Sequence, residues 1–99
     1  MGQQFIWDAS KAVANVKKHG VAFEEALTVF ADPLARIVHD PDHSASERRE
    51  IIVGHSSSQR LLVVGFTERD DTIRIINARA ASARERKDYE ATTPKSEGD

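Results

Sequence analysis

The chain contains no cysteine, and this absence limits both its structure and its chemistry. It excludes disulfide bonds, thiolate metal sites and a cysteine nucleophile. No apolar run approaches the roughly 20 residues that cross a bilayer, and the first residues lack the pattern of a signal peptide. Glycine and proline are few and 30% of the residues are charged, as in ordinary globular domains. We therefore expect a cytoplasmic protein without a membrane segment.

The length of the chain and the absence of common motifs limit the number of domains and the possible functions. Ninety-nine residues can build one modest hydrophobic core but not two. No repeat or linker interrupts the sequence, so we expect a single domain over residues 1–91 and a polar tail over 92–99. No P-loop, GxGxxG, HExxH or nucleophile elbow occurs, which excludes the common nucleotide-binding and hydrolase signatures.

The first third of the sequence predicts an edge strand and two helices. Residues 5–7 are a short apolar segment. A helix is predicted to begin after the N-cap Asp8 and to end at Gly20. Its expected buried face consists of small apolar residues at helical spacing: Ala9, Ala12, Val13 and Val16. A second helix is predicted over 23–30, ended by Asp32 and Pro33, with a buried stripe of Phe23, Ala26, Leu27 and Phe30.

The remainder changes to the pattern of strands and ends in a helix. Strands are predicted over 34–38, 49–55, 60–67 and 72–78, and the third of these is the most apolar and should be the most buried. A polar loop over 39–47, a tight connection over 56–59 and a turn at Asp70 and Asp71 separate them. Ser82 is the expected cap of a final helix. The order predicts an α+β fold in which helices cover one sheet face and leave the other partly open.

Positive charge collects where the last strand meets the last helix. Residues 74–87 hold five cations and one acid, a net charge of +4, whereas the whole chain carries −2. One interpretation is structural: Arg74 and Arg79 would pair with acids such as Glu68, Glu25 or Asp71. The other is a phosphate site, because guanidinium groups match phosphate oxygens in a bidentate manner.

Histidine and tyrosine supply the remaining candidates. His39 and His43 flank an acidic loop that contains proline, so they lack the helical spacing of a zinc motif, and we expect no metal and no cofactor. His55 ends a predicted strand and could act as an acid or base near neutral pH, although the residue taken alone favours a structural or surface histidine. Tyr89 could pack the last helix on the sheet or present its phenol to a phosphodiester.

Four phrases of the sequence together resemble one family. They are FIWDASKAVANVKKHGVAFEEALTVFADPLA, DPDHSASERRE, GHSSSQRLLVVGFTER and IRIINARAASARERKDYE, and they run from Phe5 to about Glu90. In this order they are similar to the BrnT toxins of bacterial type II toxin–antitoxin systems. The resemblance implies a RelE-like ribonuclease fold, a small antiparallel sheet with two N-terminal helices and one C-terminal helix packed on it.

The resemblance also implies an activity and partners. A BrnT toxin would be an endoribonuclease that arrests translation, in which a ribose 2′-hydroxyl attacks the adjacent phosphate without a metal ion. A BrnA-type DNA-binding antitoxin would neutralise it in a hetero-oligomer that represses its own operon, so operator DNA would be bound only through the antitoxin. The alternatives are an inactive homologue that serves as an antitoxin-binding module, and a structural protein whose arginines form surface ion pairs.

Such a reaction needs a base, an acid and cations around the phosphate, which assigns roles to the candidates. Arg74 and Arg79 belong to the R-I-I-x-A-R phrase of the family, and we expect both to bind and stabilise the phosphate. Arg84 is expected to contact the RNA backbone and Tyr89 to donate a proton. His55 and Glu68 are the candidate bases; the choice of His55 rests on its chemistry and not on the resemblance.

Overall fold

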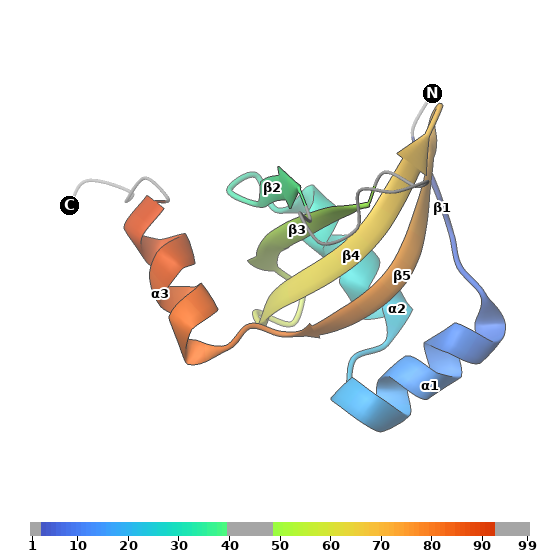
Figure 1. Cartoon of the computed structure of the whole chain (residues 1–99), viewed down its shortest axis with the longest axis horizontal. Helices are drawn as coiled ribbons and strands as arrows, with labels where there is room; N and C mark the ends of the chain where they lie inside the picture. The colour runs from blue at the N-terminus through green and yellow to red at the C-terminus, as the bar shows by residue number, and fades with distance from the viewer. Residues whose placement is uncertain (1–2, 40–48, 93–99) are drawn as a thin grey trace.

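The computed structural model describes residues 3–39 and 49–92. Within them the elements follow in the order shown in Figure 1: β1 (Gln4–Ile6), α1 (Ala9–His19), α2 (Phe23–Ala26), the 3₁₀ helix η1 (Leu27–Ala31), β2 (Arg36–His39), β3 (Glu50–His55), β4 (Leu61–Arg69), β5 (Thr72–Ala80) and α3 (Ala83–Thr92). Residues 40–47 of the expected loop, with His43, and the tail after Thr92 lie outside the described residues. His39, predicted as the first residue of that loop, is instead the last residue of β2. Thr92 itself closes α3, one residue into the expected tail.

The strands form one sheet in the order β1-β5-β4-β3-β2. Strands β2 to β5 make an antiparallel meander, as the short connections predicted. Strand β1 is an edge strand, as predicted, but it pairs with β5 in parallel, so the sheet is mixed. The α+β class is confirmed, and the tight turn after β4 depends on Asp70, which adopts a φ of 56°.

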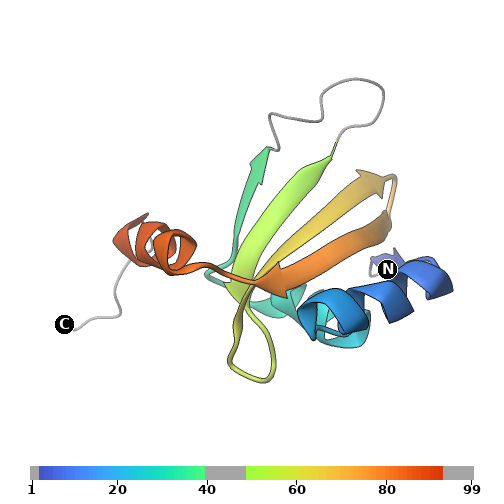
Figure 2. The ribbon, with the colours of Figure 1, turned by 60° about the horizontal axis from the view of Figure 1, so that its bottom comes forward.

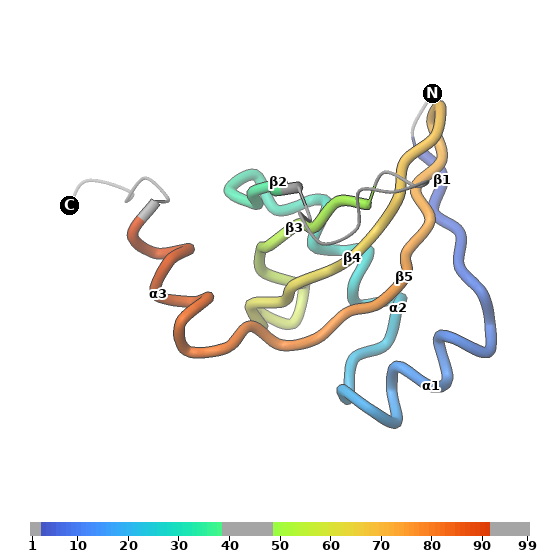
Figure 3. The backbone as a smooth tube through the Cα atoms, viewed as in Figure 1, coloured from blue at the N-terminus to red at the C-terminus, as the bar shows by residue number. Residues whose placement is uncertain are grey.

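The N-terminal helices lie on one face of this sheet, and α3 does not join them. Figure 2 shows α1 and α2 beneath the sheet, whereas α3 follows β5 out past its end. The tube in Figure 3 shows the same passage from β5 into α3 through a short extended segment. The core between helices and sheet is built from buried apolar side chains: Val21, Phe23, Ala26, Val29, Ile52, Leu62, Val64, Phe66, Ile73, Ile75 and Ala78. Among the described residues, no helix is long and apolar enough to cross a membrane.

The ends of α1 are as predicted, but its buried face is not. Asp8 caps the helix by accepting a hydrogen bond from the Lys11 amide at 3.0 Å, and Gly20 ends it with a φ of 71°. The expected buried stripe is wrong, because Val13 is 57% exposed and Val16 is 47% exposed. The helix turns Asn15 toward the sheet instead, where its side chain binds main-chain groups of other elements.

The second helix is shorter than predicted. It is α-helical only over Phe23–Ala26 and continues as the 3₁₀ helix η1. The Thr28 hydroxyl donates to the Glu25 carbonyl at 2.6 Å, a local bond that competes with regular helical pairing. The tighter winding turns Val29 into the core and leaves Leu27 and Phe30, two members of the expected stripe, only partly buried.

Candidate functional site

The open face of the sheet carries two arginines at the ends of one cross-strand row. Arg36 on β2 pairs with Val53 on β3, and Val63 on β4 pairs with Arg79 on β5. The two valines pair with each other, so an apolar floor separates the two cations by three strand spacings, about 14 Å. Helix α3 borders the row, and the side chains enclose a cavity of about 250 Å³. Its other lining residues are Val38, Ile51, Glu85, Asp88 and Tyr89.

A bulge in β5 decides which face its arginines share. Side chains alternate along a strand, so positions 74 and 79 would ordinarily point to opposite faces. The register with β4 skips Ile76, which is an additional residue in β5. The buried side accordingly switches from Ile75 to Ala78 across it. Arg74 and Arg79 therefore both point to the open face, although about 16 Å of strand separates them.

Arg79 is held by Glu85 from the first turn of α3. Its Nη1 and Nη2 atoms donate to the two carboxylate oxygens at 2.7 and 2.8 Å. Glu85 also accepts from the Ser82 amide, and the Ser82 hydroxyl accepts from the Glu85 amide, so Ser82 caps α3 as predicted. The bonds from Arg79 and then Ser82 lower the pKa of Glu85 from 4.5 to about 2, and the same pair raises the pKa of Arg79. The structural interpretation named Glu68, Glu25 or Asp71 as partners of Arg74 and Arg79. For Arg79 this was wrong, because its carboxylate partner is Glu85.

This ion pair predicts a specific acid sensitivity. Because the pKa of Glu85 is lower in the folded than in the unfolded chain, the pair stabilises the fold above about pH 4.5, and this contribution is lost as the pH falls toward 2. Both side chains are partly exposed, so we expect only about 1 kcal/mol. Urea unfolding of the wild type and of Glu85→Gln should differ by this amount at pH 7 and converge near pH 2. A difference that is the same at both pH values would contradict the assignment.

His55, Asp32 and Tyr89 form a second cluster next to the cavity. The main-chain amide of His55 donates to Asp32 Oδ2 at 2.7 Å, and its Nδ1 atom lies 3.8 Å from the same oxygen. The Tyr89 ring meets the His55 ring edge-on at 5.6 Å between centroids, and its hydroxyl donates to the Leu34 carbonyl at 3.4 Å. The imidazole remains 40% exposed. The cluster therefore holds a solvent-accessible imidazole between a carboxylate and a buried phenol.

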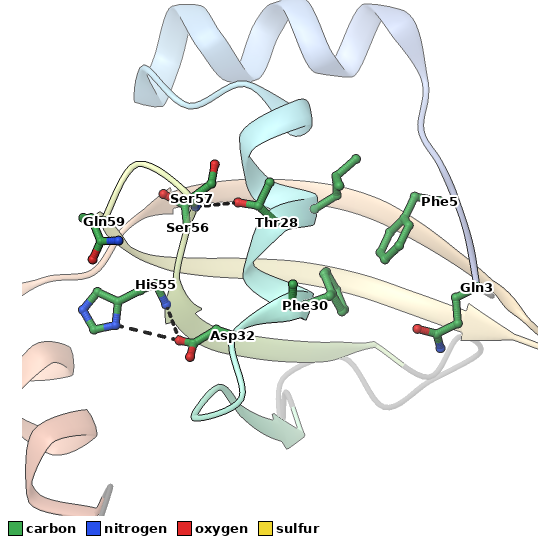
Figure 4. A pocket seen from close by; sticks show the side chains of 11 residues that line it. Gln3, Phe5, Thr28, Phe30, Asp32, His55, Ser56, Ser57 and Gln59 are labelled. Carbon is green, nitrogen blue, oxygen red and sulfur yellow. Dashed lines mark hydrogen bonds and ion pairs between the residues drawn. The ribbon is translucent and has the colours of Figure 1, made fainter. Parts of the chain in front are cut away.

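His55 also borders a larger groove on the other side of the molecule. This groove of about 810 Å³ follows η1, and Figure 4 shows Asp32, Thr28 and Ser57 along it. Among the described residues, those that line it include no lysine or arginine, and Asp32 is the one acidic residue among them. Because an RNA phosphate is negatively charged, this groove is a poorer candidate for the reacting phosphate than the open-face cavity.

The remaining predicted residues lie away from the cavity. Glu68 is exposed near the β4–β5 turn, where it accepts a hydrogen bond from Gln3 at 3.1 Å. Arg74 belongs to the same end of the sheet, since its register partner on β4 is Thr67. Arg84 is exposed in the first turn of α3. The structure thus places Arg79 and Tyr89 in the lining of one cavity and His55 against the Tyr89 ring, and it separates Arg74 and Glu68 from them.

Three residues that line the open-face cavity or belong to the His55 cluster were not predicted from the sequence. Arg36 lies in a short strand whose pairing was unknown, and Asp32 was interpreted only as the end of a helix. Glu85 was counted merely as the one acid in the basic segment. The S-x-x-E spacing of Ser82 and Glu85 could have indicated a capping box, but no local signal connects Asp32 with His55, 23 positions further along the chain.

Comparison with known proteins decides the family. Residues 7–85 match the family model described as the ribonuclease toxin BrnT of type II toxin–antitoxin systems. The chain belongs to the BrnT family. It is therefore a ribonuclease toxin of a type II system, and such a system includes a protein antitoxin. The matched region contains Arg36, Arg79 and Glu85 but ends before Tyr89.

The fold comparison agrees with BrnT membership. The 1.1 Å crystal structure of the Brucella abortus ribonuclease toxin BrnT aligns with a TM-score of 0.63 at 22% identity, covering 81% of this chain and 97% of that one. At this identity the alignment shows a shared fold and does not transfer individual residues. The search of curated proteins gave no match.

Proposed function

We propose that this BrnT toxin is an endoribonuclease that cleaves RNA without a metal ion and thereby arrests translation. The ribose 2′-oxygen forms a bond to the adjacent phosphorus while the bond to the 5′-oxygen breaks. The products are a 2′,3′-cyclic phosphate and a free 5′-hydroxyl: the 2′-hydroxyl proton passes to a protein base, and the departing 5′-oxygen takes a proton from solvent water. The observation that carries the proposal is the open-face cavity, in which Arg79 and Arg36 flank an apolar floor beside α3.

The side chains suggest distinct roles in this reaction. Arg79 stabilises the charge that develops on the phosphate. His55 takes the 2′-hydroxyl proton, since its imidazole is accessible and its Nδ1 atom lies 3.8 Å from the Asp32 carboxylate. Tyr89 packs against His55, and we assign it to holding that ring. Arg74 and Arg84, both exposed, would contact the RNA backbone on either side of the cavity. Glu68 is given no role in this reaction because it lies near the β4–β5 turn, away from the cavity.

Metal removal tests the proposal directly. RNA cleavage by the purified protein is expected to continue at an unchanged rate in EDTA, because cations and a base on the protein supply the chemistry. The cleaved ends should be a 2′,3′-cyclic phosphate and a 5′-hydroxyl, which end-labelling and mass spectrometry distinguish from metal-dependent products. Cleavage abolished by EDTA would contradict metal independence. A folded protein that cleaves no RNA would favour the antitoxin-binding module instead.

We further propose that the antitoxin is of the BrnA type, that it binds DNA, and that the hetero-oligomer represses its own operon. The net charge of −2 and a pI near 6.1 argue against a general affinity of the toxin for DNA, which supports operator contact through the antitoxin alone. The site of action would be the cytoplasm, where translated RNA is found. Operator binding measured with toxin, antitoxin and the complex separately tests this assignment.

A further inference from the structure

Helix α3 contributes Glu85, Asp88 and Tyr89 to the lining of the open-face cavity. Glu85 and Tyr89 are four positions apart and therefore lie above one another on the helix. Glu85 reaches Arg79 on β5, and Tyr89 reaches His55 on β3. None of the roles considered so far involves Glu85, although it makes the closest contacts to the arginine that is central to the proposed reaction.

The bonds of Arg79 leave one edge of its guanidinium group available. A guanidinium has five N–H donors, arranged as an end formed by Nη1 and Nη2 and a side edge formed by Nε and Nη2. The carboxylate of Glu85 accepts hydrogen bonds from one N–H of Nη1 and one N–H of Nη2, at the end of the guanidinium. The second N–H of Nη1 donates to the Ala80 carbonyl at 3.4 Å. Among the described residues no hydrogen bond engages Nε or the second Nη2 donor. These two form a complete fork that fits two phosphate oxygens.

A second arginine–carboxylate pair shows the contrasting arrangement. Arg60 binds Glu25 through its side edge, with Nε at 3.0 Å, and its Nη2 also donates to the Gly20 carbonyl. That carboxylate also accepts from the buried Ser56, so the pair ties the β3–β4 turn to α2. Its guanidinium has no side edge left for a ligand. The two pairs therefore differ in whether the Nε–Nη2 edge of the arginine is still available to bind a phosphate.

We propose that Glu85 is a positioning residue of the ribonuclease reaction: it holds Arg79 by its end so that the side edge faces the scissile phosphate above the valine floor. This inference rests on the proposed function. Glu85 is itself fixed by the Ser82 amide at 2.8 Å. A pre-oriented donor fork loses little freedom when the transition state forms, whereas a mobile arginine must be ordered in each turnover. Arg79 is 41% exposed and so accessible to RNA.

A positioning role of Glu85 predicts different effects on RNA affinity and on the rate of the chemical step. A carboxylate beside a phosphate site weakens the attraction of RNA to the free enzyme, because the pair is nearly neutral. Removing Glu85 should therefore leave RNA affinity unchanged or make it tighter. The same change should slow the chemical step, because the guanidinium is no longer held in the reactive orientation.

Single-turnover cleavage of a short RNA tests the inference. Glu85→Ala is expected to lower the rate constant about 10- to 100-fold without weakening RNA binding, and Glu85→Gln should lie in between because its amide oxygen can still accept one bond. Loss of folded protein would reduce the amplitude rather than the rate constant, so the measurement separates the two. Glu25→Gln is the matched control, since it alters a pair of the same kind outside the cavity, and it should keep the wild-type rate constant.

The outcomes distinguish the inference from the function on which it rests. Glu85 variants that are folded and cleave at the wild-type rate or faster would overturn the positioning role while leaving the ribonuclease intact. A rate lowered equally by Glu25→Gln would also overturn it, because the effect would then be general. Absence of cleavage by the wild-type protein would overturn the proposed function and this role of Glu85 with it.

Discussion

Replacing Arg79 with alanine is expected to lower the rate constant of RNA cleavage by about 100- to 1000-fold, the usual loss when one donor to a developing oxyanion is removed. The protein should stay folded, because the pair that Arg79 forms with Glu85 is partly exposed and contributes about 1 kcal/mol at most. Single-turnover cleavage in EDTA measures the rate constant, and circular dichroism confirms the fold.

Two further arginine substitutions make this result interpretable. Arg79→Lys keeps the charge but loses the planar fork, so it should recover only a small part of the activity. Arg69→Ala removes an exposed cation at the end of β4, outside the cavity, and should leave the rate constant unchanged. If Arg79→Ala cleaves RNA as fast as the wild type, the reaction takes place elsewhere on the protein and the open-face assignment is wrong.

Replacing Asn15 with alanine is expected to destabilise the fold by about 3 kcal/mol, a large share of the stability of a small domain. The buried Asn15 amide donates to the carbonyls of Val21 and Ala78, both at 2.8 Å, and accepts from the Ala78 amide at 3.1 Å. Alanine would leave three buried main-chain groups without partners. Urea unfolding followed by the fluorescence of Trp7, the single tryptophan, measures the change.

An exposed asparagine on β5 provides the control for this experiment. The Asn77 side chain lies over Gly65 on the open face, where water can replace any bond that its amide makes. Asn77→Ala should therefore change the free energy of unfolding by no more than about 0.5 kcal/mol. Equal effects at both positions, or a stable Asn15→Ala variant, would show that the link from α1 to β5 does not hold the helix on the sheet.

Local signals in the sequence were sufficient for most elements. The cap residues Asp8, Gly20 and Ser82 act within one helical turn, and the structure confirms each of them. The apolar run of β4 forms the most buried strand, as expected, and even Leu61 and Val63, on the face that the N-terminal helices do not cover, are buried. These predictions succeed because each depends on residues only a few positions apart.

The face of α1 could not be predicted from apolar spacing. A helical pattern of alanine and valine indicates a stripe, but three hydrogen bonds to distant main-chain groups turn Asn15 inward instead. Their partners, Val21 and Ala78, are set by the packing of α1 against β5, and Ala78 is 63 positions away. The energy of satisfying buried polar groups outweighed the burial of two valines.

The sequence by itself determined the family, the α+β class and the concentration of arginines around α3 from which the site proposal begins. Only the tertiary structure decided that a bulge at Ile76 turns Arg74 and Arg79 to one face, and that Arg79 and Arg36 line one cavity from opposite ends of a cross-strand row. It also decided that Asp32 contacts His55. The physical reason is that strand register and the contacts of distant residues follow from the packing of the whole sheet, which no short segment of the chain encodes.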